Sequence, residues 1–413
     1  TVLCRVATLG YDSCADASRF PPMPHFSPLA TGLALALGLA GAAPALAFDD
    51  DTLVVWMGAN RGADQLGKVG KRFEEELGIA VEVLEVEPLA EKFQQAASTG
   101  DGPDIVLWAH DRFGEWAAGG LLAPVQPSAG FRDGVLATGL EALTFGGRTW
   151  GYPVALEAAT LIWNKALIES PPAAFEGIAT LELPDGTTPI LWDYNNAYFT
   201  FPLMMANGGY AFRKVDGSYD GSEAGVNNEG ALQGAEALAA LIEGGTMPSG
   251  VDYGVMEGAM SKGEVAMIIN GPWAWKGLTD AGIEFGVAPV PPLDGAEVEP
   301  FVGVLSAGIN AASPNADLAA EFLENYALAD EGLMVWNADN VLGGLADVSA
   351  AAGQGDERVA AMLEIAANGV PMPSNPEMGG FWSAMEPALA NITTGAQAPQ
   401  VALDDAAARI LGD

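Results

Sequence analysis

Several chemically active side chains follow a buried apolar run at residues 104–113, DIVLWAHDRF. The run around Val106 is apolar enough for a strand inside a sheet, and Trp108, His110, Asp111 and Arg112 come directly after it. An imidazole near a carboxylate could support acid–base chemistry. An indole beside an acid and a guanidinium suits a different task, which is to hold a ligand with an apolar face and a polar rim.

The acid–base interpretation has few residues to work with. The chain has two histidines, His25 and His110, and no serine in a nucleophile-elbow pattern. Both cysteines, Cys4 and Cys14, precede the first predicted strand. We therefore expect no catalytic residues, no cofactor and no His/Cys metal site in residues 48–413, and we interpret His110 as a structural hydrogen-bonding residue.

One enzymatic alternative stays open. Asp111 and Glu157 could form the pair of carboxylates that glycoside hydrolysis requires, and a chain this rich in acids can supply such a pair in many ways. The competing interpretation is that each acid accepts hydrogen bonds or lies on the surface. A glycoside hydrolase is therefore a remote alternative, and we expect a protein that is not an enzyme.

Tryptophans favour a carbohydrate ligand. The chain has 10 tryptophans, and Trp108, Trp273, Trp275 and Trp382 stand beside glycine, proline or polar residues. A pyranose ring has an apolar face that stacks on an indole or a phenol, and its hydroxyls donate to carboxylates and accept from guanidinium groups. Each of these tryptophans could instead belong to a hydrophobic core.

The charge balance excludes two classes of partner. The 54 acids outweigh 17 bases, for a formal net charge of −37. Arg5 and Arg19 are balanced by Asp12 and Asp16, so residues 48–413 keep that charge. Nucleic acids and anionic membranes both need clustered lysine and arginine, so neither is expected as a partner.

The N-terminal segment predicts export. Residues 29–47 are apolar and end in Ala45-Leu46-Ala47, which is typical of a signal peptide at 23–47 cleaved after Ala47. Residues 1–22 resemble neither a signal nor a domain and are interpreted as a possible upstream leader. We expect a periplasmic protein without a lipid anchor, since residues 48–413 contain no cysteine.

The elements that carry these residues read as β-α-β-α-β. Strands are predicted at 52–57, 79–86 and 104–109, with helices between them, the first having Leu66, Val69, Phe73 and Leu77 on one face. This order predicts a mainly parallel sheet with helices on both sides. Further strands are predicted at 264–271 and 301–310, one amphipathic helix at 316–333, and mostly helix from 356 onward.

At these residues the sequence resembles the maltose/maltodextrin-binding proteins of bacterial ABC importers. The resemblance runs from about Leu53 to the C-terminus and is most specific in STGDGPDIVLWAHDRF, INGPWAW and FVGVLSAGINAASPN. It implies an α/β, periplasmic-binding-protein-like fold with two lobes, crossing hinge segments and a ligand cleft between the lobes. We expect the first lobe at 48–155 and 306–352, and the second at 156–305 and 353–413.

The resemblance also implies which residues bind the ligand. Trp108, Asp111 and Arg112 match cleft residues of the first lobe, and Glu157 matches an acid near the lobe crossing. Aromatic residues of the second lobe match the platform on which glucosyl rings stack. The full expected set is Asn60, Arg61, Glu91, Trp108, Asp111, Arg112, Glu157, Tyr198, Trp273 and Trp382.

Some positions depart from the family pattern. Asn60-Arg61 replaces Asp-Lys, Asn196 replaces a glutamate, and Glu386 replaces an arginine. The implied function is binding of maltose and maltodextrins and delivery to a membrane ABC permease by hinge closure. The departures leave another di- or oligosaccharide, such as trehalose or sucrose, as the alternative. A chemoreceptor is a further possible partner, and a monomer is expected.

Overall fold

The computed structural model describes residues 51–215 and 218–412. Three expectations concern residues outside these ranges, namely the leader at 1–22, the signal peptide at 23–47, and cleavage after Ala47; Cys4 and Cys14 lie there too. None of the helices in the described ranges combines the length and the apolar character that crossing a bilayer would require.

The predicted strands join a larger sheet with the order β14-β6-β13-β3-β1-β2, and β15 pairs with β13. Its strands are β1 (Thr52–Met57), β2 (Ala80–Glu85), β3 (Ile105–Ala109), β6 (Tyr152–Ala158), β13 (Phe301–Ile309), β14 (Gly344–Leu345) and β15 (Val370–Pro371). The three N-terminal strands are parallel, as predicted. The prediction of a mainly parallel sheet is wrong for β6, β13 and β14, because β13 runs antiparallel to both β3 and β6 and β14 runs antiparallel to β6, whereas the short β15 is parallel to β13.

A smaller sheet has the order β12-β7-β11-β8. It consists of β7 (Thr160–Asn164), β8 (Thr188–Leu191), β11 (Val265–Asn270) and β12 (Phe285–Ala288). Two short hairpins complete the described strands: β4 (Thr144–Phe145) with β5 (Arg148–Thr149), and β9 (Arg213–Val215) with β10 (Ser218–Asp220).

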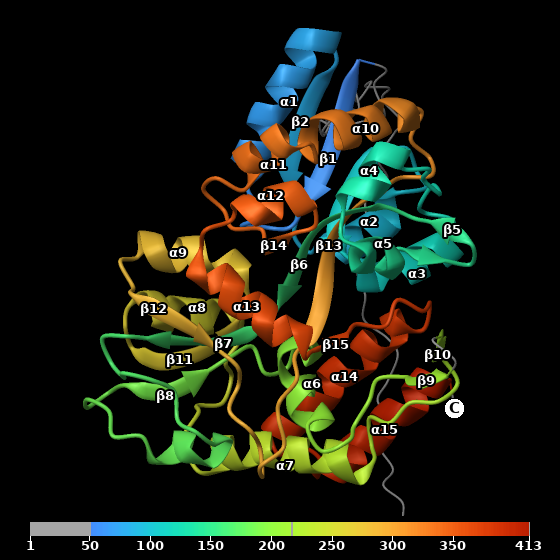
Figure 1. Cartoon of the computed structure of the whole chain (residues 1–413). Coiled ribbons are helices and arrows are strands. Elements are labelled where there is room, and N and C mark those ends of the chain that lie inside the picture. Colours follow the sequence, from blue (N-terminus) through green and yellow to red (C-terminus); the bar gives the residue numbers. More distant parts are fainter. Residues whose placement is uncertain (1–50, 216–217, 413) are drawn as a thin grey trace, which may run out of the picture. The chain divides into compact units, whose positions relative to one another are not determined.

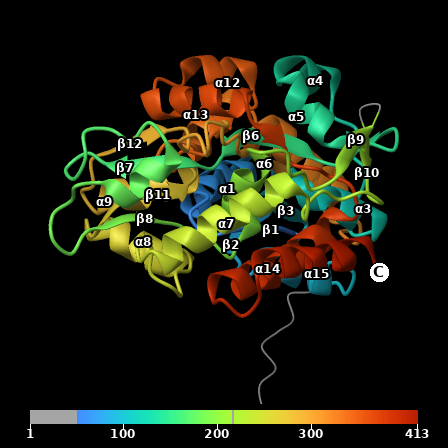
Figure 2. The same cartoon turned by 90° about the horizontal axis from the view of Figure 1, so that it is seen from below.

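Each sheet has its own helices. Those within residues 63–142 and 316–353 are α1 (Ala63–Leu77), α2 (Leu89–Ala96), α3 (Phe113–Ala118), α4 (Ala129–Gly134), α5 (Ala137–Ala142), α10 (Ala316–Phe322), α11 (Asp330–Trp336) and α12 (Val348–Gly353), with a 3₁₀ turn η1 (His110–Arg112) and a π-helical turn η4 (Leu323–Ala327). The others are α6 (Ala197–Met205), α7 (Glu229–Glu243), α8 (Tyr253–Ser261), α9 (Trp275–Asp280), α13 (Glu357–Ala367), α14 (Met378–Thr393) and α15 (Pro399–Leu411), with 3₁₀ turns η2 (Phe175–Thr180) and η3 (Pro272–Ala274). Helices α14 and α15 lie side by side in both views (Figures 1 and 2).

The hydrophobic cores separate in the same way, so the fold has two α/β lobes. Leu305, Ala307 and Ile309 at one end of β13 belong to the core of the larger sheet, whereas Phe301 and Val302 at the other end belong to the core of the smaller sheet. The chain also passes from β6 to β7 through Ala159 alone. These two passages connect the lobes, as does the segment between α12 and α13, and Figure 1 shows β6 and β13 running alongside each other.

Two helix predictions need correction. Leu66, Val69 and Phe73 of α1 are buried, but Leu77 is 47% exposed because it stands at the last position before Gly78 ends the helix. The single helix predicted at 316–333 is instead α10, η4 and α11. The chain folds back on itself there, and a Cβ at Gly332 would lie 1.6 Å from the carbonyl oxygen of Tyr326, so only glycine permits the approach.

Candidate functional site

Two neighbouring strands of the larger sheet deliver polar residues to the same edge. β1 and β3 are parallel, with Met57 beside Leu107, so the segments that follow both strands leave the sheet at their carboxyl ends. The segment after β1 carries Arg61, and η1 after β3 carries Asp111 and Arg112. Ligands of open α/β sheets bind at this edge.

The smaller sheet contributes in the same manner. β8 and β11 are parallel neighbours, with Leu191 beside Ile268. The segment after β8 carries Asn196 and Tyr198, and the turn after β11 carries Trp273. Both sheets thus present the ends of parallel strands to one site.

These segments enclose a cavity of about 390 Å³. It is lined from both lobes by Gly58, Arg61, Leu107, Trp108, Ala109, Asp111, Arg112, Glu157, Asp193, Asn195, Asn196, Ala197, Tyr198, Phe199, Trp273, Leu305, Met372, Trp382 and Glu386. Its volume falls at the small end of the ~300–1,000 Å³ typical of ligand pockets. An apolar wall with a few placed polar groups is the composition expected for such a site.

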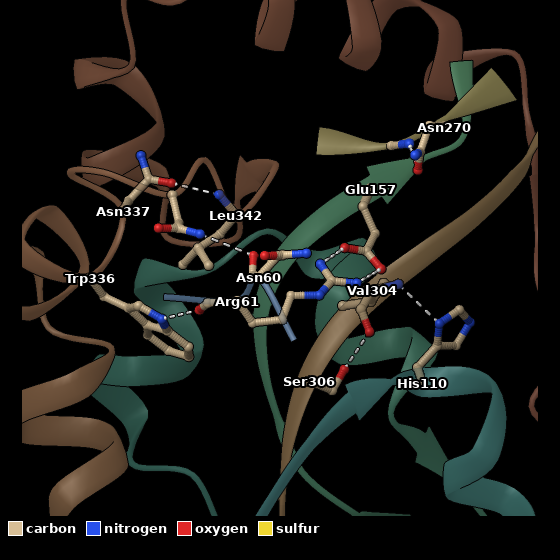
Figure 3. Close-up of polar contacts among 12 residues, drawn as sticks. Asn60, Arg61, His110, Glu157, Asn270, Val304, Ser306, Trp336, Asn337 and Leu342 are labelled. Atoms are coloured by element: carbon tan, nitrogen blue, oxygen red, sulfur yellow. Dashed lines mark hydrogen bonds and ion pairs between the residues drawn. The ribbon is translucent and has the colours of Figure 1, made fainter. Parts of the chain in front are cut away.

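Arg61 and Glu157 form the main ion pair of the cavity. Nη1 and Nη2 of Arg61 donate to the two carboxylate oxygens of Glu157 over 2.5 Å and 3.1 Å (Figure 3). The Glu157 side chain is nearly buried, and the guanidinium also lies 4.8 Å from the centre of the Trp273 ring. A two-pronged pair of this kind fixes the orientation of both groups.

One residue in α11 and one in the segment after it bind the backbone that carries Arg61. The Trp336 indole donates to the Arg61 carbonyl over 2.8 Å, and the Asn340 amide donates to the Asn60 carbonyl over 3.1 Å (Figure 3). Asn60 and Gly62 on either side have φ of 62° and 77°. The guanidinium is therefore aimed into the cavity by a constrained loop.

Asp111 is buried and bonded across the cavity. The indole N–H of Trp382 in α14 donates to its carboxylate over 2.9 Å. Burial raises the pKa of Asp111 to about 6, while Arg112 and the bond from Trp382 act in the opposite direction. The Asp111 carboxyl group therefore gains or loses its proton closer to neutral pH than an exposed aspartate does.

Arg112 is oriented by its own lobe. Its guanidinium donates to Glu115 over 3.1 Å, and Gln94 donates to the other oxygen of Glu115 over 2.7 Å. This chain of contacts from α2 and α3 leaves the arginine on the cavity wall with a fixed position.

Aromatic rings form most of the wall from the second lobe. The rings of Tyr198 and Trp273 lie 6.0 Å apart at an angle of 48°. A Cβ at Gly271 would lie 2.2 Å from the Trp273 ring, so the glycine allows that ring to lie close against the turn. Trp382 packs edge-on against Phe301 and Phe381.

Two further acids line the cavity, Asp193 in the segment after β8 and Glu386 in α14. Burial raises the pKa of Asp193 to about 6, Asn196 lowers it, and Asp252 and Glu386 raise it further. Glu157 has its arginine, whereas the ion pairs formed among residues 51–215 and 218–412 do not include Asp193 or Glu386. This part of the wall therefore presents carboxylates to the cavity without a neighbouring guanidinium or ammonium group.

His110 has a structural role, as expected from the sequence. The Val304 amide donates to its Nδ1 over 3.1 Å, so Nε2 carries the proton and donates to the Met372 carbonyl over 3.0 Å (Figure 3 labels His110 and Val304). Burial lowers the pKa of His110 to about 4. The ring is neutral and engaged on both sides, and it does not line the cavity. Across residues 51–215 and 218–412, no group of three or more His, Asp or Glu side chains could hold a metal ion.

Eight of the ten expected site residues line the cavity, and two do not. Asn60 is exposed and takes part through its backbone carbonyl, and Glu91 is exposed in the first turn of α2. Glu87, which precedes α2, contacts the segment after β1 and accepts from the Ala59 amide over 2.9 Å. Trp275, next to the turn of Trp273, is a core residue.

Sequence reasoning missed several lining residues. Asp193 and Asn195 stand in the polar run directly after β8, and the same strand-end argument that found Asp111 would have found them. Phe199 continues that run into α6. Met372 comes from the segment after β15, and no sequence signal marks it.

Comparisons with known proteins agree with this geometry. Residues 60–333 match the family described as "Bacterial extracellular solute-binding protein". The chain is 30% identical to the galactooligosaccharide-binding protein of Bacillus subtilis over 372 residues, covering 86% of this chain and 87% of that protein. It is 26% identical to a maltooligosaccharide ABC transporter solute-binding lipoprotein of Streptococcus pneumoniae, covering 82% and 83%, and 28% identical to the maltotriose-binding protein of Pyrococcus abyssi, covering 75% and 70%. The chain therefore belongs to the bacterial extracellular solute-binding protein family and is a binding protein, not an enzyme.

Proposed function

We propose that the protein captures neutral oligosaccharides, with maltose and maltodextrins as the first candidates, and delivers them to an ABC importer. The observation that carries the proposal is one cavity that combines aromatic rings from both lobes with buried carboxylates and guanidinium groups. Trp108, Tyr198, Trp273 and Trp382 supply faces for pyranose rings. Asp111, Arg112 and Glu157 supply acceptors and donors for the hydroxyls.

The proposed mechanism is closure of the two lobes around the sugar. A ligand that contacts both lobes binds the closed form better and shifts the equilibrium toward it. A shift from mostly open to mostly closed requires ~5.5 kcal/mol of differential affinity. Stacked rings at ~0.5–1.5 kcal/mol each and several hydrogen bonds of ~0.5–1.5 kcal/mol can supply this amount.

The separation of the cores supports the proposed lobe boundaries of 48–155 with 306–352 and 156–305 with 353–413. At the first crossing, Ala155 packs with the larger sheet and Ala158 with the smaller one. At the second, Val302 packs with the smaller sheet and Leu305 with the larger one, so this crossing comes slightly before the proposed boundary at 306. Closure would then bend the chain near Ala159, near Val304 in β13, and in the segment before α13.

The identity of the sugar has a specific second candidate. The relative from Bacillus subtilis is named for galactooligosaccharides, whereas those from Streptococcus pneumoniae and Pyrococcus abyssi are named for maltooligosaccharides and maltotriose. The departures at Arg61, Asn196 and Glu386 all lie on the cavity wall, where they would change hydroxyl recognition. We therefore place galactooligosaccharides beside maltodextrins, and trehalose or sucrose after them.

The proposed location is the periplasm, reached through the signal peptide expected at 23–47 and without a lipid anchor. The proposed partner is a membrane permease of the ABC class that recognises the closed form. Interaction with a chemoreceptor and the monomeric state stay predictions from the sequence.

A thermal-shift screen tests the proposal. Maltose, maltotriose, maltotetraose, galactobiose, galactotriose, trehalose and sucrose would each be added at millimolar concentration. A ligand present at 100 times its dissociation constant stabilises the folded state by about 2.7 kcal/mol, so a true ligand should raise the melting temperature by several degrees. A rise with α-glucans alone supports maltodextrins, a rise with galactosides alone supports the second candidate, and no rise with any sugar contradicts the proposal.

A further inference from the structure

One aromatic face of the cavity is already covered by a side chain of the protein itself. Trp273 lines the cavity, and the guanidinium of Arg61 lies over its ring at 4.8 Å from the centre. The same ring lies close to Gly271 and beside Tyr198 and Phe199. The guanidinium thus occupies a face of the indole on which a pyranose could otherwise stack.

Contacts from three residues hold the Arg61 guanidinium over the Trp273 ring. Glu157 binds the guanidinium through both carboxylate oxygens, and the Glu157 side chain is 4% exposed. Trp336 and Asn340 fix the backbone on either side of the arginine side chain. A planar guanidinium is well suited to this position, because it can pair with a carboxylate in its plane and stack on a ring with its face.

We propose that Arg61 is an internal competitor for the sugar ring at Trp273 and thereby determines which oligosaccharide lengths bind well. The inference rests on the proposed function. A sugar that uses Trp108, Tyr198 and Trp382 leaves the cover undisturbed. A sugar that reaches Trp273 must displace the guanidinium from the ring, so the free energy of stacking on the indole is offset by the cost of breaking the cation–π interaction.

If Arg61 competes with the sugar, removal of its guanidinium should increase the affinity from one particular oligosaccharide length onward. In the wild-type protein, the affinity stops rising with chain length at the length whose added ring reaches Trp273. Removal of the guanidinium restores the rise, by about three- to thirtyfold at that length, which is the range that corresponds to a cation–π interaction. Shorter sugars show no such increase in affinity.

The double variant Arg61→Ala/Glu157→Gln removes both members of the buried ion pair, so that neither charge is left alone. It is compared with Glu157→Gln, in which the amide oxygen still accepts a hydrogen bond from the guanidinium. Arg72→Ala is the matched control, because Arg72 also pairs with acids and lies 5.4 Å from the centre of the Tyr326 ring, but it is exposed and does not line the cavity.

Two measurements decide the inference. Calorimetric titration with malto- and galactooligosaccharides of two to five units should show this increase in affinity with length in Arg61→Ala/Glu157→Gln and not in Glu157→Gln. Acrylamide quenching of Trp273, taken as the difference from the same protein with Trp273→Phe, needs no ligand and should rise in the double variant. Arg72→Ala should match the wild type in both.

Equal losses of affinity at all lengths in the double variant relative to Glu157→Gln would make Arg61 a direct sugar ligand and overturn the inference. Unchanged quenching would also overturn it, because the ring would not be covered in solution. If the wild-type protein binds none of these sugars while quenching rises in the double variant, the cover exists and the proposed function is the part that fails.

Discussion

The indole N–H of Trp382 donates a hydrogen bond of 2.9 Å to the carboxylate of Asp111. Trp382 belongs to α14 beside the core of the smaller sheet, and Asp111 belongs to the turn after β3 of the larger sheet. The bond thus joins two elements that lobe opening would separate. It also places an acid whose pKa is raised to about 6 next to an aromatic ring, which is the combination that a sugar requires.

Trp382→Phe isolates this bond. Phenylalanine keeps the packing on Phe301 and Phe381 but cannot donate to Asp111. A hydrogen bond to a charged group contributes ~1.5–3 kcal/mol. Because this bond joins the two lobes, its loss disfavours the closed form that binds sugar. We therefore expect sugar affinity to fall by about tenfold or more, with little change in the melting temperature. Calorimetry provides the affinity. Trp150→Phe, which removes an indole bond to the Phe145 carbonyl away from the cavity, should leave affinity unchanged.

Trp108 and Trp275 should respond to truncation in opposite ways. Trp108 is partly exposed on the cavity wall, so Trp108→Ala should weaken sugar binding by about three- to tenfold and cost little stability. Trp275 is 1% exposed, with Phe285 beside it and the Arg358 guanidinium 5.3 Å from the ring centre. Trp275→Ala should lower the free energy of unfolding by about 3–5 kcal/mol and leave affinity unchanged in the fraction that folds. Urea denaturation and calorimetry on both variants test this assignment. A large loss of stability in Trp108→Ala or a loss of affinity in Trp275→Ala would contradict it.

Asp111 should make the protein less stable as the pH rises from about 4 to about 6. Its pKa is about 6 in the folded protein and about 3.9 in the unfolded chain, so the folded state binds more protons in this window. The contribution is present below pH 4 and declines by up to about 3 kcal/mol as the pH passes 6. In urea denaturation series, Asp111→Asn should make stability rise more steeply with pH between pH 4 and 6 than it does in the wild type, whereas Asp185→Asn, at an exposed acid, should leave that pH dependence unchanged. The same pH dependence in Asp111→Asn and the wild type would show that Asp111 does not titrate in this way.

His110 should act in the opposite direction over nearly the same range. Its pKa is about 4 in the folded protein and about 6.5 in the unfolded chain, so the unfolded state binds more protons between these values. The stability it contributes is present above pH 6.5 and is lost as the pH falls toward 4. The two neighbours therefore largely cancel in the wild type. Asp111→Asn alone should leave a protein that loses stability on acidification, and the same denaturation series would show a flat profile if His110 did not titrate in this way.

The sequence could predict the parts of the fold that depend on local pattern. Strands such as β1 and β11 are uninterrupted apolar runs, and Gly78 marks the end of α1. The direction of β13 could not be predicted, because it depends on a chain that returns from the other lobe and inserts between β3 and β6. The break within 316–333 places Gly332 against the Tyr326 carbonyl, and the helical periodicity of that segment gives no sign of this contact.

The site shows the same division. Trp108, Asp111 and Arg112 were predictable because they lie at the end of a buried strand or just after it, and Trp273 because its turn contains Gly271 and Pro272. The pairing of Arg61 with Glu157 was not, because the two residues are 96 positions apart and only the fold brings them together. Asn60 was expected in the cavity because Asn60-Arg61 matches the Asp-Lys pair of the family pattern, but its side chain is exposed and its carbonyl accepts from Asn340.

Calorimetric titration of the wild-type protein and of Trp108→Ala/Trp382→Phe with maltotriose and galactotriose tests the central claim most directly. That claim is that rings and charged groups from both lobes bind one oligosaccharide in one cavity. We predict saturable heat with at least one of the two sugars for the wild type, and an affinity at least about thirtyfold lower for the double variant, as losses from both walls combine. No heat with either sugar, or the same affinity in both proteins, would contradict the claim.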